Sequence, residues 1–337
     1  MGEYTKKWLS IEQQADKLRD RGVEIEPRSQ TIALLGAVGY YRLTGYLYPL
    51  RKSELRLDEH GKGQLEILGD YRPGASVAHV ARVIEFDRQL RMLVMDGVER
   101  IEVAVRMRLG YVLGRRSAFA HLDPETFHPA FTEHQVDDAT GWRTRPSKHA
   151  EWLARVAARR DGSDEAFVAH FREKYDGQMP IWALTEILEL GHISRLYRGL
   201  NDGDANEIAQ AFGVPTKTLM ANWLASVNYV RNVAAHHARL FNRKLQYAPS
   251  RPKVGVVPPL DHLRSSSAPK GAFGTYNALA VIAYLGRAID GDSAWCIRLA
   301  QLLADFPSSP HLTIASVGVP EGWESLDLWN APGATDT

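Results

Sequence analysis

An apolar stripe between Ser76 and Gly114 constrains the fold more than any other feature of the sequence. Apolar residues recur in this segment at intervals of three, four and seven. They include Val83, Phe86, Leu90, Val94, Ile101, Val105 and Val112. This spacing places them on one side of an α-helix, and Ser76 is a residue type that favours the N-cap. Such a long helix needs partners along its whole apolar side, which favours a protein built from packed helices.

The remaining chain adds shorter helical patterns, separated by stretches rich in proline and glycine. We expect helices over 10–21, 29–41, 148–160, 163–175, 181–200, 204–212, 216–247, 275–290 and 293–306. Residues 116–147 have no sustained period, so we expect a long loop there with one helical turn. Residues 59–74 carry four glycines and are expected to form a boundary, and the one weak strand pattern covers 253–257.

These patterns predict an all-α protein. We divide it into an N-terminal helical extension over 1–75, a helical core over 76–306 with extra C-terminal helices, and a tail over 307–337 that packs on the core.

Composition narrows the classes of protein that are possible. Forty-one basic and 40 acidic residues among 337 give a formal charge of +1, so contact with nucleic acid requires a local patch. The one cysteine, Cys296, excludes an intramolecular disulfide and a zinc site built from several thiolates. Neither a spanning apolar segment nor a signal peptide is evident. We therefore expect a cytoplasmic protein without membrane contact.

The segment 227–245, VNYVRNVAAHHARLFNRKL, carries the chemistry. Arg231 precedes two histidines, His236 and His237, and six basic residues but no acidic one lie between 231 and 253. On a helical projection one side is apolar: Trp223, Val227, Val230, Ala234, Phe241 and Leu245. The opposite side carries Asn232, His236, Arg239 and Arg243, whereas His237 projects toward the apolar side.

Such a face suits a small anion site that contains an imidazole. An arginine binds phosphate with two parallel hydrogen bonds, and a histidine can exchange protons near neutral pH. In RNA these groups are the ones needed for attack of a 2′-OH on the adjacent phosphate, without a metal. The simpler interpretation is a solvated or ion-paired helix face, because similar Arg–His spacings recur at Arg72, Arg115 and Arg143. His237 can equally be a core imidazole.

Three other groups of residues invite a functional interpretation. Tyr41 and Arg42 belong to an aromatic and basic cluster over 40–52 that can stack on RNA bases, although packing tyrosines would give the same pattern. Glu99 and Glu102 on the long helix can orient Arg231, or Glu102 can pair with Arg106. The third group lies within 121–138: His121, His128, His134, Asp123, Glu125, Asp137 and Asp138. It lacks the spacing of metal ligands, so no metal is expected.

The sequence resembles the abortive-infection (Abi) proteins of bacteria, a branch of the HEPN superfamily. The resemblance rests on GYYRLTGYLYP at 39–49, FDRQLRMLVMDGVERIEVAVR at 86–106, FVAHFREKY at 167–175, MPIWALTEILELGHISRLY at 179–197, VRNVAAHHARLFNR at 230–243 and GVPEGWESLDLW at 318–329. It therefore spans nearly the whole chain.

This resemblance implies a HEPN-type helical bundle and a metal-independent ribonuclease without cofactor, acting in phage defence or as a toxin. It implies a homodimer, because one well-placed motif per chain would need a second copy to complete the site. Arg231 would contact the scissile phosphate, Asn232 would position the phosphate or His236, and His236 would be the acid or base, with His237 as the uncertain member. Arg239, Arg243, Tyr41 and Arg42 would bind RNA. An antitoxin, either protein or RNA, would restrain the activity.

Two other hypotheses remain open from the sequence. The bundle can bind RNA or a partner protein without cutting it. Alternatively, the polar face can be a dimer seam in which asparagine, histidine and arginine form a structural network.

Overall fold

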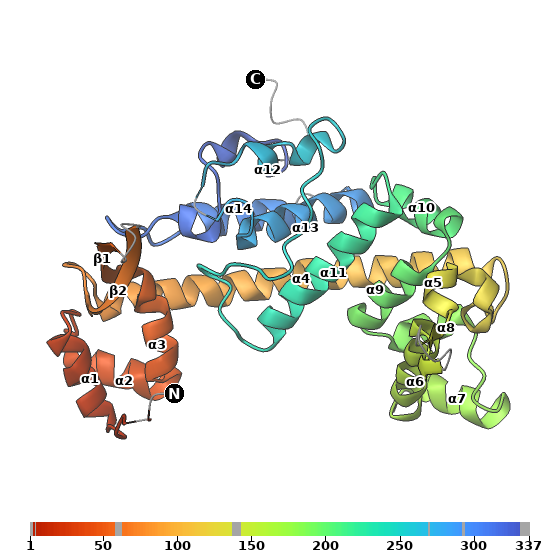
Figure 1. Ribbon diagram of the computed structural model, residues 1–337, viewed down its shortest axis with the longest axis horizontal. Coiled ribbons are helices and arrows are strands. Elements are labelled where there is room, and N and C mark those ends of the chain that lie inside the picture. The colour runs from red at the N-terminus through yellow and green to blue at the C-terminus, as the bar shows by residue number, and fades with distance from the viewer. Residues whose placement is uncertain are drawn as a thin grey trace.

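The computed structural model describes residues 3, 5–57, 63–136, 143–268, 270–291 and 294–330. These residues are mostly helical, which confirms the all-α prediction. Helix α4 (Val77–Gly114) runs the length of the molecule (Figure 1). Helices α1–α3 lie at one end of α4, helices α5–α9 lie at its other end, and both groups are on the same side of α4. Helices α13 and α14 run along the opposite side of α4. Within the described residues, no helix has both the length and the apolar character needed to cross a bilayer.

Helix α4 forms the centre of the core, as its stripe predicts. The Ser76 hydroxyl accepts a hydrogen bond from the His79 amide, at 3.1 Å, and so caps the first turn. Every residue of the predicted stripe is buried. Gly97 lets α13 and α14 approach closely, because a Cβ there would lie 2.6 Å from Trp295 and 2.8 Å from Ile282. A larger residue at position 97 would push these helices apart.

The N-terminal extension contains three helices: α1 (Ile11–Asp20), α2 (Arg28–Val38) and α3 (Tyr40–Leu47). The expected helix over 29–41 is in fact divided between α2 and α3 at Gly39. The φ angle of Gly39 is +79°, which interrupts a right-handed helix and suits glycine. The chain therefore turns there, and α3 packs against α4.

An antiparallel hairpin follows, formed by β1 (Arg51–Leu57) and β2 (Gly63–Tyr71). No strand was expected in this part of the chain, so the hairpin was missed from the sequence. Leu55 pairs with Leu65 across the ribbon, and both are exposed. A strand without a buried face lacks the alternation that marks an ordinary half-buried strand, which explains why no strand was predicted here.

The opposite end of α4 carries α5 (Pro129–Thr132), the short strands β3 (Gln135–Val136) and β4 (Arg143–Arg145), and helices α6 (Lys148–Asp161), α7 (Ala166–Lys174), α8 (Ile181–Leu184) and α9 (Leu190–Gly199). The helix expected over 181–200 is wrong, because the backbone of Leu188 and Glu189 is extended. The carbonyl of Ile187, freed by this break, accepts a hydrogen bond from Arg159 of α6, at 3.1 Å.

Helices α10 (Asp202–Ala211) and α11 (Lys217–Ala235) cross back over α4, and α12 (His262–Ser265), α13 (Thr275–Asp290) and α14 (Ala294–Ala304) complete the described helices. Residues 253–257 are irregular, so the strand expected there is absent. In the C-terminal segment the Trp329 indole donates to the Tyr276 hydroxyl at 3.0 Å, which ties this segment to α13.

Candidate functional site

The motif lies at the C-terminal end of α11. Thr216 caps the start of this helix, and the predicted apolar residues Trp223, Val227, Val230 and Ala234 are buried. Arg231 and Asn232 occupy the last turn and are half-buried. The Arg231 guanidinium donates to the Asn232 side-chain oxygen at 3.1 Å, so the two polar groups are held together.

The helix ends twelve residues earlier than the expected limit at 247, and this changes the position of every basic residue that follows. His236 is the C-cap, and its amide donates to the Asn232 carbonyl at 3.0 Å. The amide of His237 donates to the Ala234 carbonyl and that of Ala238 to the Val233 carbonyl, both at 3.0 Å. These two bonds form a Schellman motif, the usual ending at a left-handed residue.

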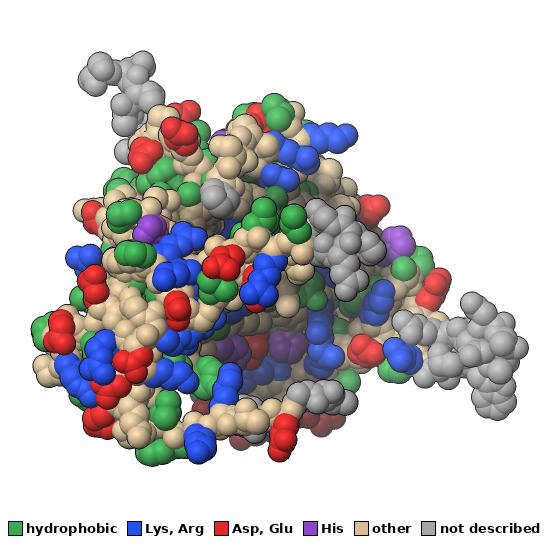
Figure 2. Space-filling view, turned by 60° about the vertical axis from the view of Figure 1, so that its left-hand side comes forward, with side chains coloured by type: hydrophobic (Ala, Val, Ile, Leu, Met, Phe, Trp, Pro, Cys, Tyr) green, Lys and Arg blue, Asp and Glu red, His purple; other side chains and the backbone are tan. Residues whose placement is uncertain are grey.

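His237 is that left-handed residue, with a φ of +56°. Glycine is the common choice there, and a side chain costs about 1 kcal/mol. Both His236 and His237 are exposed. The expectation that His237 projects toward the apolar side is therefore wrong, because the helix that would orient it has already ended. On the face shown in Figure 2, histidine side chains lie in a hollow bordered by lysine and arginine side chains.

A buried carboxylate on α4 fixes the turn after the histidines. Asp87 is fully buried, and its Oδ1 accepts the amides of Leu240 and Phe241, at 3.1 Å and 2.6 Å. Its Oδ2 accepts the Tyr46 hydroxyl at 2.5 Å and pairs with Arg91. Burial, and then the Asp87 charge, raise the pKa of the Tyr46 phenol. Asp87 was not selected from the sequence, although an acid within an apolar helical stripe is the signal that marks it.

Three of the predicted RNA-binding arginines make protein contacts. Arg42 donates to the His237 carbonyl at 2.8 Å, so α3 braces the turn directly. Arg239 donates to the Gly45 carbonyl, and its guanidinium carbon lies 5.7 Å from the Tyr46 ring centroid. Burial lowers the pKa of the Arg239 guanidinium. Arg243 donates to the Arg239 carbonyl at 2.7 Å. Because α11 has ended, Arg239 and Arg243 do not lie on its polar side.

The other predicted side chains lie as follows. Tyr41 is 76% exposed on α3, and its ring packs edge-on against Tyr40. Glu102 is buried and pairs with Arg106, which agrees with the simpler alternative for this residue. Glu99 is exposed on the same helix.

His128 and the backbone of His121 take part in local hydrogen bonds of the irregular segment. His128 Nδ1 accepts the Ala130 amide at 3.2 Å at the start of α5, and the His121 carbonyl is hydrogen-bonded by the His149 ring at 2.8 Å. Asp137 and Asp138 lie outside the described residues. Within the described part of the chain, no three His, Cys, Asp or Glu side chains gather as metal ligands.

His121 is expected to make the protein less stable in acid. Burial, and then the neighbouring His149, lower the pKa of His121 to about 4 from its usual value near 6.5. Between these two pH values, the His121 imidazole is therefore protonated in the unfolded chain but neutral in the folded chain. The free energy of unfolding should fall as the pH drops from about 6.5 toward 4, by up to roughly 3 kcal/mol.

Urea denaturation across this pH range measures the effect. His121→Gln should show a shallower decline than the wild type, because the amide does not titrate. His134→Gln, which removes an exposed imidazole, should retain the wild-type slope. Equal slopes for the wild type and His121→Gln would contradict the assignment.

Comparison with known protein families gives one informative match. The family model described as Abi-like protein matches residues 33–242, which is well over half of the chain. Neither a curated protein nor a solved structure matches the chain. The matched region begins within α2, includes α4 and α9, and ends just after the histidine turn.

Proposed function

Since the chain belongs to the Abi-like protein family, we propose that it is an abortive-infection effector and, more specifically, a metal-independent endoribonuclease of the HEPN superfamily. One observation carries the nuclease proposal. Solvent-exposed His236 follows Asn232 by one helical turn, and the Asn232 amide holds the Arg231 guanidinium. An imidazole and a phosphate-binding cation therefore lie within five residues of each other at the end of α11.

The proposed reaction uses these groups and a second imidazole. His236 takes the proton from a ribose 2′-OH, and the 2′-oxygen forms a bond to the adjacent phosphorus. The bond from phosphorus to the 5′-oxygen breaks, and a second imidazole donates its proton to that leaving oxygen. Arg231 binds the phosphate oxygens as charge develops on them. The products carry a 2′,3′-cyclic phosphate and a 5′-OH.

We propose that the active form is a homodimer. The sequence offers one well-placed motif per chain, and the reaction needs two imidazoles, one as base and one as acid. A second copy of the turn at 236–237 can supply the acid, because both histidines of this turn are open to solvent. An antitoxin that restrains the nuclease in its host, as protein or RNA, fits the same proposal.

Induction in a bacterial host tests the nuclease proposal directly. The wild-type protein should arrest growth and generate new RNA fragments with 5′-OH ends, while Arg231→Ala should do neither. The control is Arg172→Ala, which removes an exposed arginine on α7 and should behave as the wild type.

Other results would favour the rival functions. If the Arg231→Ala variant arrests growth as severely as the wild type does, the assignment of Arg231 to the nuclease site is contradicted. If the protein binds RNA and leaves it intact, the binding-module alternative is favoured, and Arg243→Ala should then weaken binding as much as His236→Ala does.

A further inference from the structure

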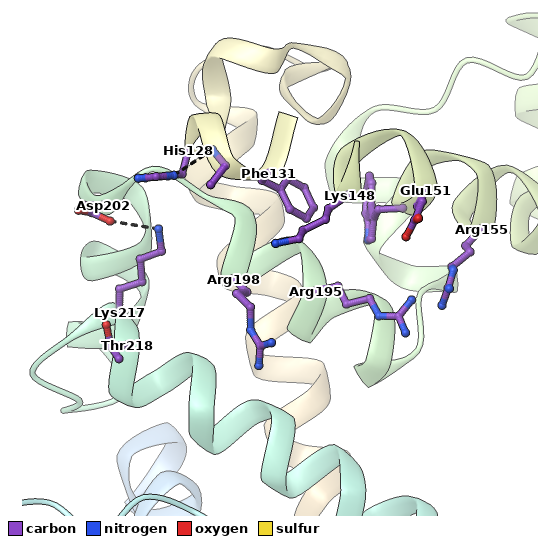
Figure 3. A pocket seen from close by; sticks show the side chains of 12 residues that line it. His128, Phe131, Lys148, Glu151, Arg155, Arg195, Arg198, Asp202, Lys217 and Thr218 are labelled. Carbon is purple, nitrogen blue, oxygen red and sulfur yellow. Dashed lines mark hydrogen bonds and ion pairs between the residues drawn. The ribbon is translucent and has the colours of Figure 1, made fainter. Parts of the chain in front are cut away.

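A groove with several positively charged side chains leads to the motif. Two cavities, of about 540 Å³ and 520 Å³, share Arg155, Arg195 and Arg198 in their walls, so they are parts of one groove. The first cavity is shown in Figure 3, where Lys148 and Arg198 extend into it. The second cavity reaches Asn232, the partner of Arg231.

The helical period explains why three helices contribute to this groove. On α9, His192, Arg195 and Arg198 are spaced by three residues and share a side, while Leu190, Ile193 and Leu196 are buried on the other side. On α6, Lys148 and Arg155 are two turns apart. On α11, Asn228 and Asn232 are one turn apart, so all three polar sides meet where α6 and α11 pack against α9.

The charges of the groove are largely available for a ligand. Four exposed cations in its wall make no ion pair within the described residues: Lys148, Arg155, Arg195 and Arg198. Lys217 is neutralised by Asp202 at 3.0 Å. Glu151 and Glu189 are the other acids in the wall, so a positive excess remains.

The end of the groove near the motif adds groups that suit a nucleic acid base. Tyr229 and Tyr247 pack edge-to-face with ring centroids 5.5 Å apart, and Tyr247 is 64% exposed. His192 lines the same cavity, and burial lowers its pKa. Unpaired cations along a groove with an exposed aromatic at one end are the features that bind single-stranded RNA.

We propose that single-stranded RNA lies in this groove along α9, with its phosphates on Lys148, Arg155, Arg195 and Arg198, and enters the motif past Tyr247 and Asn232. This inference deepens the proposed nuclease function and rests on RNA being its substrate. The proposal assigns RNA binding to side chains of α6 and α9. Arg239 and Arg243, which follow the histidines, instead brace the turn at 236–237.

Binding of RNA to a protein that cannot cut it tests the groove. We would measure the Kd for a fluorescent single-stranded RNA by anisotropy, with His236→Ala as the parent. Adding Arg195→Glu and Arg198→Glu should raise the Kd by 10- to 100-fold. Loss of two phosphate contacts should also reduce the slope of log K against log salt by about 1.4.

The matched control carries the same change of charge on α7, as Arg172→Glu with Lys174→Glu, both at exposed positions. It should keep the Kd of the parent within about twofold. Lys148→Glu on α6 is an independent variant that should weaken binding without a change on α9. All five substituted side chains are exposed, and thermal melting verifies that each variant is folded.

Each outcome decides the proposal separately from the nuclease function. If the α9 double variant binds as the control does, or if the parent does not bind RNA, the groove proposal is overturned. A duplex RNA that binds as tightly as the single strand overturns the single-strand assignment. RNA that binds in the groove but is not cut by the wild-type protein overturns the nuclease function and leaves the groove in place.

Discussion

Replacing His236 by alanine is expected to slow RNA cleavage by the purified protein by a factor of about 10² to 10⁴, the range that general acid–base catalysis contributes. The side chain is exposed at the C-cap of α11, and within the described part of the chain no hydrogen bond uses its ring, so the variant should fold normally. Single-turnover cleavage of a labelled RNA in the presence of a chelator measures the rate and the chemistry of the ends.

Two companion variants make this result specific to one imidazole. His170→Ala removes an exposed histidine on α7 and should leave the rate unchanged. His237→Gly places glycine at the left-handed position, where it is the favoured residue, so the turn should remain folded while the second imidazole is lost. A rate for His236→Ala equal to that of the wild type would contradict the assignment, and a slow His237→Gly would assign catalysis to the second ring as well.

Asp87→Ala is expected to lower the free energy of unfolding by about 3–5 kcal/mol, the usual cost of removing one partner of a buried ion pair. The substitution leaves the buried Arg91 charge without its partner and removes the acceptor for the amides of Leu240 and Phe241. Because these amides lie three and four residues after His237, cleavage should weaken together with stability. Urea denaturation measures the loss.

The same helix supplies the control. Asp96 forms an exposed ion pair with Arg298 at 2.6 Å, and such pairs contribute about 1 kcal/mol or less. Asp96→Ala should therefore be nearly neutral. Asp87→Asn retains a side-chain oxygen for the two amides but not the charge for Arg91, so an intermediate loss is expected. Equal losses for Asp87→Ala and Asp96→Ala would show that the buried carboxylate is not an anchor.

Local periodicity predicted much of the fold. The stripe and N-cap of α4 depend on residues within a few turns of one another, and the structure confirms both. The apolar side of α11 was predicted from the same kind of signal, as was the nearness of Asn232 to His236. Such features follow from the helix repeat, whatever surrounds the helix.

The end of α11 shows where local signals failed. Where a helix ends at a left-handed residue, that residue is usually glycine, but here it is His237, so the sequence pattern continued beyond the true end. The exposed hairpin of β1 and β2 and the extended link between α8 and α9 were missed for related reasons. In each case a favourable contact elsewhere, or the absence of a buried face, decided the local conformation.

The sequence by itself determined the long helix α4, the apolar sides of α4 and α11, and the residue types of the motif. The two helical features are encoded at separations of three or four residues. Only the tertiary structure decided where the motif turn is held, since Asp87 reaches Leu240 across 153 residues. It also decided that arginines of α6 and α9 line a groove ending at Asn232. Both depend on helices distant in sequence packing together, and the helical period within each segment carries no information about which segments meet.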